Sequence, residues 1–187
     1  MKCAGRSRDG DRRTGKPAQP GGFSLRRVGM LSILPLACMG AHAAQPAIDS
    51  LCHAPETTYF SCRTARHKTV SLCGNLPSSL QYRYGKPVQV ALRFPADAAL
   101  GSKQLGYAHY SRYQTERTEI TFSHVDTDYS VFDYTEDGVR HAGVRIAMAD
   151  GREREIRCAG PIRGELAPLG KSLRCDSDNA LNGGQCP

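Results

Sequence analysis

The chain lacks the patterns that mark several common catalytic classes. No G-x-S-x-G motif surrounds a nucleophilic serine, and no glycine-rich loop is spaced to hold a phosphate. The cysteines lack the closely spaced pairs of a zinc site or of a thioredoxin-type redox centre. There is also no apolar run of about 20 residues, the length needed to cross a bilayer. These absences predict a chain without a cofactor, a bound metal or a transmembrane span.

Helical periodicity is absent as well. No stretch of ten residues repeats apolar side chains at helical spacing, whereas segments 80–84, 88–94 and 144–148 alternate apolar and polar residues. This alternation is typical of half-buried strands. The sequence therefore predicts an all-β fold of about eight or nine antiparallel strands in a single sandwich or up-and-down barrel. We expect the strands near 58–63, 69–73, 79–84, 88–94, 106–113, 117–125, 129–135, 139–148 and 152–158.

The longest apolar run, residues 28–40, follows Arg26 and Arg27 and precedes Ala41-His42-Ala43. A basic flank, a short apolar core and an A-x-A end predict a secretory signal peptide over 1–43, cleaved near Ala43. A lipid anchor at Cys38 is the alternative, although Pro35 stands where that signal has an aliphatic residue. The protein is expected to be periplasmic or secreted. We divide the remainder into a lead-in (44–56), an antiparallel β domain (57–160) and an irregular tail (161–187).

Most of the positive charge belongs to this leader. The whole chain has a formal net charge of +7, but the part after residue 43 holds 17 Lys and Arg against 16 Asp and Glu, a net charge of +1. A nearly neutral domain gives no electrostatic reason to bind nucleic acid.

Six cysteines lie downstream of the leader. An even number in an exported chain predicts disulfides and an oxidising compartment. Six cysteines allow 15 pairings, among which the sequence does not choose. We expect three disulfides with no free thiol, and we favour the pairs Cys52–Cys73, Cys62–Cys158 and Cys175–Cys186, the second joining two strands that face the core.

Turn signals allow the strand register to be tested. A three-residue loop over 149–151, with Gly151 in the left-handed region, pairs Val144 with Ile156 and keeps the apolar residues on one face. A three-residue loop over 136–138 likewise places Phe132 opposite Ala142. A turn at 126–128 places Phe122 opposite Phe132. The expected buried face then carries Ile120, Phe122, Phe132, Val144, Ile146 and Ile156.

This register, extended through a loop at 114–116, also predicts a row of exposed side chains. Asp133 would lie directly opposite His141, and Arg112 would join the row only at a frayed strand end. Tyrosine with histidine and arginine is typical of recognition surfaces, although cross-strand aromatic packing explains the same composition. The candidate partner-binding residues are Tyr107, His109, Arg112, Tyr113, Asp133 and His141.

Four segments carry a resemblance to known proteins. Residues 59–62 (YFSC), 68–73 (KTVSLC), 80–87 (LQYRYGKP) and 175–182 (CDSDNALN) resemble a group of small exported proteobacterial proteins with no assigned activity. Phe60-Ser61-Cys62 is also similar to the Tyr-x-Cys strand of the periplasmic C-type lysozyme inhibitors, which are small exported β-barrels. Their Ser-Gly-rich inhibitory loop has no counterpart in this chain.

The sequence thus favours an exported, non-catalytic binding or envelope-associated β module. Its partner would be an unknown protein or another component of the envelope. The resemblance implies, as an alternative, a lysozyme inhibitor that occludes the active site of the enzyme. A hydrolase with an unrecognised site is the second alternative.

Overall fold

The computed structural model describes residues 50–186, and the predicted signal peptide, its cleavage site and Cys38 lie outside them. The elements, in chain order, are β1 (Thr57–Thr64), β2 (Thr69–Asn75), β3 (Ser79–Lys86), β4 (Gln89–Phe94), η1 (Ala98–Leu100), α1 (Gly101–Gln104), β5 (Gly106–Arg112), β6 (Thr115–Ser123), β7 (Thr127–Glu136), β8 (Val139–Met148), β9 (Glu153–Gly164), η2 (Ala167–Lys171), β10 (Arg174–Cys175) and η3 (Ala180–Asn182).

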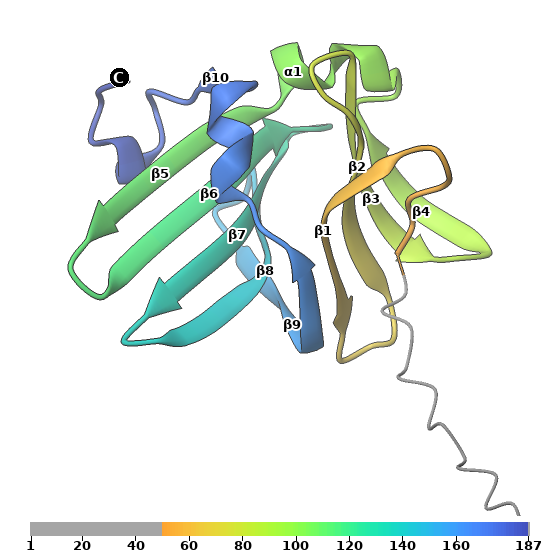
Figure 1. Ribbon diagram of the computed structural model, residues 1–187, viewed down its shortest axis with the longest axis horizontal. Helices are drawn as coiled ribbons and strands as arrows, with labels where there is room; N and C mark the ends of the chain where they lie inside the picture. The colour runs from red at the N-terminus through yellow and green to blue at the C-terminus, as the bar shows by residue number, and fades with distance from the viewer. Residues whose placement is uncertain (1–49, 187) are drawn as a thin grey trace, which may run out of the picture. The chain divides into compact units, whose positions relative to one another are not determined.

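Within residues 50–186, ten strands form one curled sheet in the order β10-β5-β6-β7-β8-β9-β1-β2-β3-β4 (Figure 1). The mostly-β fold is confirmed, but the expected eight or nine strands are ten. The extra strand, β10, pairs parallel with β5 rather than antiparallel, and its two residues are too few to show alternation. β4 and β5, consecutive in the chain, do not pair, so the sheet is an open half-barrel rather than a closed barrel or a sandwich of two sheets.

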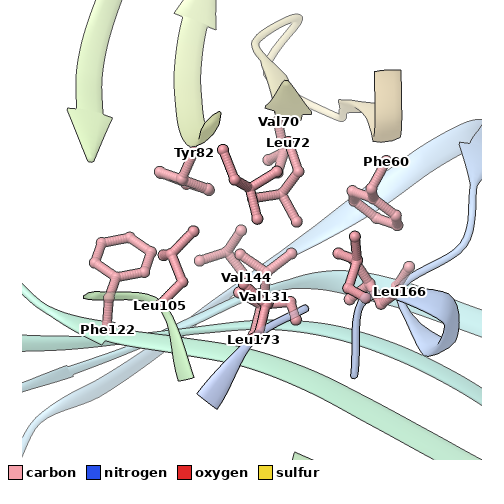
Figure 2. Close-up of a cluster of buried hydrophobic side chains, with 14 of the residues drawn as sticks. Phe60, Val70, Leu72, Tyr82, Leu105, Phe122, Val131, Val144, Leu166 and Leu173 are labelled. Carbon is pink, nitrogen blue, oxygen red and sulfur yellow. The ribbon is translucent and has the colours of Figure 1, made fainter. Parts of the chain in front are cut away.

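The core lies between the two halves of this sheet. Figure 2 shows Val70, Leu72 and Tyr82, from β2 and β3, pointing toward side chains such as Phe122 and Val144 of the other half. Burial of each such side chain contributes about 1.5–3 kcal/mol. At the unpaired edge, the ring of Phe94 in β4 stacks on Phe122 in β6 with 4.4 Å between centroids. Side-chain packing therefore holds together two strands that no backbone ladder joins.

All six cysteines of the described part are paired, and the three favoured pairs are confirmed. Cys62–Cys158 joins β1 to β9, Cys52–Cys73 ties the lead-in to β2, and Cys175–Cys186 closes a loop in the tail. Three structural disulfides fit a non-cytoplasmic protein.

The tail is more ordered than expected. β9 continues to Gly164, beyond the predicted end at 158, and Leu166, Leu169 and Leu173 are buried in the core. The side-chain amide of Asn182 pairs with the edge of β5 like a short strand, accepting from the backbone N–H of His109 (3.0 Å) and donating to the backbone carbonyl of residue 107 (3.1 Å). The tail thereby covers an edge that would otherwise expose unpaired backbone groups.

The lead-in covers the outer face of β1–β3. Leu51 is buried there, and its backbone N–H donates to Ser71 Oγ. The Arg83 guanidinium, on β3, donates to the Leu51 carbonyl (2.9 Å) and to both carboxylate oxygens of Glu56 (2.7 and 2.6 Å). Since Arg83 is buried, this network fixes residues 50–56 over the strands.

The register prediction was right at one hairpin and wrong at three. At 149–151 the three-residue loop is present, and Val144 lies opposite Ile156. The other hairpins instead turn through two residues, Asp137-Gly138, Val125-Asp126 and Tyr113-Gln114. Asp137 and Gly138 both have positive φ (48° and 77°), as a type I′ turn requires.

These shorter turns move Phe132 to the opposite face. Phe132 lies across from Gly143, not Ala142, while Val131 takes the core position opposite Ile120 and Val144. Phe122 lies across from Tyr129, not Phe132. The prediction assumed that only one face of the sheet is buried, yet Phe132 is only 3% exposed on the outer face. Ile120, Phe122 and Val144 do line the core, Ile146 packs partly buried against it, and Ile156 is half-buried on β9.

Candidate functional site

The corrected register divides the predicted partner-binding row between the two faces of the sheet. Tyr107, His109 and Asp133 lie on the face that carries Ile120 and the core, because Tyr107 pairs with Ile120, and Asp133 with Thr118, two residues before it. Arg112 and His141 belong to the outer face, and Tyr113 lies in a turn. Asp133 faces Ala142 rather than His141. The six residues therefore do not form the contiguous surface that the sequence predicted.

The three members on the core side make local structural contacts. The Tyr107 hydroxyl donates to the Ala167 carbonyl under η2 (3.0 Å), and burial raises the pKa of Tyr107. His109 Nε2 lies 3.4 Å from the Glu116 carboxylate. Asp133 accepts two hydrogen bonds of 2.7 Å from Arg140. These contacts link neighbouring strands and fasten η2 to the sheet.

A different row crosses the outer face of β5–β8, whose strands lie side by side in Figure 1. Tyr110 pairs with Arg117, Arg117 with Tyr134, and Tyr134 with His141, so one residue from each strand contributes. Tyr110 and His141 are exposed at the two ends of the row. The Arg117 guanidinium lies 5.4 Å from the centroid of the Tyr134 ring, within range of a cation–π contact. We call these four residues the outer row.

Beside the outer row, a buried carboxylate fixes the geometry. Glu119 is 4% exposed, and it accepts hydrogen bonds from Tyr134, from Arg145 (3.1 Å) and from the Asn179 amide (2.7 Å). Burial and the hydrogen bond to Glu119 raise the pKa of Tyr134 to about 12, so its hydroxyl remains a donor at neutral pH. Because three donors engage this carboxylate, it holds β7, β8 and the tail in fixed positions.

Arg145 extends the same network. Burial acts to lower the pKa of Arg145, but the hydrogen bonds and charges of Tyr134 and Glu119 outweigh it and keep the pKa above its usual value. The guanidinium also lies 5.6 Å from the Phe132 ring centroid and 4.0 Å from the Glu155 carboxylate. The Arg145 guanidinium is therefore held in one position, beside the Phe132 ring.

These groups line an open groove of about 750 Å³ on the outer face of β6–β9, bordered by Asn179, Ala180 and Leu181 of the tail. Most of its charges are already paired, for example Arg117 with Glu136 and Arg157 with Glu155. No group of three or more His, Cys, Asp or Glu among residues 50–186 is placed to hold a metal ion. The groove presents aromatic ring edges, guanidinium donors and the exposed imidazole of His141, all of which can contact a binding partner.

A second exposed feature lies at the tips of two hairpins. Tyr113, in the β5–β6 turn, is 87% exposed, and Val139, after the β7–β8 turn, is 54% exposed. The two tips are joined by a hydrogen bond from the Asp137 N–H to the Gln114 carbonyl (2.9 Å). An aromatic side chain thus projects from a braced pair of turns.

Sequence reasoning missed Tyr110, Arg117, Tyr134 and Glu119. Asp137-Gly138 is the signal that would have placed Tyr134, since Asp-Gly between alternating segments favours a two-residue turn, whereas the positions of Tyr110, Arg117 and Glu119 also depend on the turns at 113–114 and 125–126. With that turn, Tyr134 and His141 are opposite each other and on the same face as Phe132.

Comparison with family models, curated proteins and solved structures finds no match to this chain. No helix within residues 50–186 is long and apolar enough to span a membrane.

Proposed function

We propose that this protein is an exported, non-catalytic binding module that contacts a protein or another envelope component through the outer row and its groove. The observation that carries the proposal is the Tyr110–Arg117–Tyr134–His141 row on a face that no other segment of residues 50–186 covers completely. The three disulfides support a site of action in the periplasm or outside the cell.

The energetics of recognition favour this face. Tyrosine and arginine are over-represented among residues that dominate binding energy, because they bury large areas with few rotatable bonds or with a rigid donor fork. Arg117 and Arg145 are held by carboxylates and by ring contacts before any partner arrives. Pre-arrangement of this kind lowers the ordering cost of association.

The test uses the disulfide-bonded mature domain as bait in periplasmic extract, followed by the same capture with variants. Y110A/H141A removes the two exposed ends of the outer row. K86A/V88A, at the exposed β3–β4 turn, is the matched control. We expect the control to retain the captured partner and Y110A/H141A to weaken its binding at least tenfold. Equal retention by both variants would contradict the proposal.

A lysozyme inhibitor is the second candidate, and the braced hairpin tips favour it. Tyr113 is exposed enough to enter an enzyme cleft, and the hydrogen bond between residues 137 and 114 limits its movement. Titration of C-type lysozyme with the purified domain tests this directly. Inhibition at nanomolar concentration that is lost in Y113A would establish this candidate, and undiminished lysozyme activity at micromolar domain would exclude it.

A further inference from the structure

A second pocket, of about 330 Å³, lies at the β9 end of the outer groove, with which it shares Glu155 and Arg157, and none of the four outer-row residues lines it. Its walls come from the β1–β2 turn (Ala65 and Arg66), from Tyr84 of β3 and from the first half of β9. Arg154 lies opposite Ile146, and Ile156 opposite Val144, so both belong to the core-facing side of β9. Pockets of this size at the open ends of curled sheets are common ligand sites.

The pocket carries an excess of positive charge. Three arginines, Arg66, Arg154 and Arg157, line it against one carboxylate, Glu155. Glu155 is already paired with Arg157 at 2.5 Å. Arg66 and Arg154 are exposed and have no ion-pair partner among residues 50–186. Two guanidinium groups therefore remain available to a ligand.

The surroundings of Tyr84 also carry positive charge. The Lys68 ammonium lies 5.0 Å from the centroid of the Tyr84 ring, which adds a further cation beside the pocket. Burial raises the pKa of Tyr84 while the charges of Arg154 and Arg66 act to lower it, so both guanidinium groups act on the phenol. Ile156 and Ala65 supply apolar wall beside these polar groups.

We infer that this pocket binds a phosphate group, with Arg66 and Arg154 as its principal ligands. The planar guanidinium fork matches the oxygens of phosphate, and such charge-assisted hydrogen bonds are about twice as strong as neutral ones. The apolar wall accommodates the carbon part of a phosphate ester. The phosphate could be free or belong to a lipid headgroup, and both sources present the same chemistry. This inference does not depend on the outer row.

Two arms test it. In the first, inorganic phosphate is added to ¹⁵N-labelled mature protein at constant ionic strength while amide shifts are recorded. We expect saturable shifts at residues 65–68 and 154–157. The double variant R66A/R154A should weaken the affinity at least tenfold, whereas R93A/R163A, which removes two exposed arginines elsewhere, should leave it unchanged.

In the second arm, the same proteins are sedimented with phosphatidylglycerol or phosphatidylcholine vesicles. Binding to phosphatidylglycerol that R66A/R154A abolishes identifies a lipid headgroup as the source. Saturable phosphate binding without vesicle binding supports the site and assigns it to a free phosphate or small ester. Absence of saturable shifts, or equal losses in the two double variants, would overturn the inference.

Discussion

The outer faces of the two halves of the sheet differ in how completely other segments of residues 50–186 cover them. Over β1–β3 the chain provides its own cover, since residues 50–56 are fixed there by Cys52–Cys73 and by the Arg83–Glu56 pair. Among residues 50–186, only the tail borders the outer face of β5–β8, where the groove stays open with His141 in its lining, and Tyr110 is exposed at the other end of the outer row. Each face contains a buried charged group, Arg83 on the first and Glu119 on the second, and each of them fixes neighbouring segments through hydrogen bonds.

The largest expected effect comes from releasing the cover of the first face. C52A/C73A removes a link between residues 21 apart in sequence. Loss of a disulfide with such a loop should lower the free energy of unfolding by about 3 kcal/mol. Urea unfolding measures this loss, and hydrogen exchange at the Leu51 amide should accelerate with it. A loss below about 1 kcal/mol would show that Cys52–Cys73 contributes little to holding the lead-in.

Removing the carboxylate of Glu56, the partner of buried Arg83, should lower the free energy of unfolding somewhat less than the loss of the disulfide. E56Q leaves the Arg83 charge, whose side chain is 7% exposed, without its carboxylate. Breaking a buried pair costs about 3–5 kcal/mol, and because Glu56 is itself 21% exposed we expect about 2 kcal/mol. Urea unfolding at pH 7 checks this value, with E153Q, at an exposed position, as the control.

The same pair predicts how stability depends on pH. The hydrogen bonds from Arg83 lower the pKa of Glu56 below 4.5, despite the opposing effect of burial. A carboxyl whose pKa is lowered by folding stabilises the protein above its unfolded pKa, and that contribution is lost as the pH falls through the folded value. The stability difference between wild type and E56Q should therefore shrink below about pH 4.5. A difference that stays constant down to pH 2 would contradict this account.

A smaller effect, of opposite sign, is expected at the β6–β7 turn on the open half. Val125 and Asp126 have φ of 47° and 52°, which a β-branched residue rarely adopts. Replacing them with Asn and Gly (V125N/D126G) supplies the preferred type I′ residues and should stabilise the fold by about 1 kcal/mol. Thermal unfolding tests the gain, and binding through the outer row should be unchanged. Destabilisation would mean that the turn has another conformation.

The smallest stability effect is expected in the outer row itself. Tyr110 and His141 are exposed, so Y110A/H141A should change the free energy of unfolding by less than about 0.5 kcal/mol. Chemical denaturation would verify that any binding defect of this variant does not come from unfolding. A loss above about 1.5 kcal/mol would mean that these side chains support the sheet rather than contact a partner.

Whether one or both faces of a strand are buried explains what could be predicted from the sequence. Alternation reveals strands wherever one face is polar, and the favoured cysteine pairs are those that the structure contains. Alternation failed near Phe132, because Val131 and Phe132 are both buried, one on each face. No residue at 125–126 signals a two-residue turn, since valine is unusual at positive φ.

The candidate site was only partly predictable for the same reason. The sequence placed His141 correctly on the exposed face, but Arg112 was placed on the outer face only once the turns were known, and Tyr107 moved to the core side in the same shift. The buried contacts of Glu119 with Tyr134 and Asn179 join residues 15 and 60 positions apart, a relation that no local pattern contains. A one-residue error in a single hairpin exchanges every side chain of a strand between faces.

Under the proposed function, the open outer face of β5–β8 meets the partner, whereas the covered half does not. Site-specific photo-crosslinking in the producing cells tests it, with a photoreactive residue at position 110, 141 or 88 of the full chain. Val88, 96% exposed in the β3–β4 turn, is the control for accessibility. We expect a discrete crosslinked product from positions 110 and 141 and none from 88. Products from position 88 alone, or from none of the three, would contradict it.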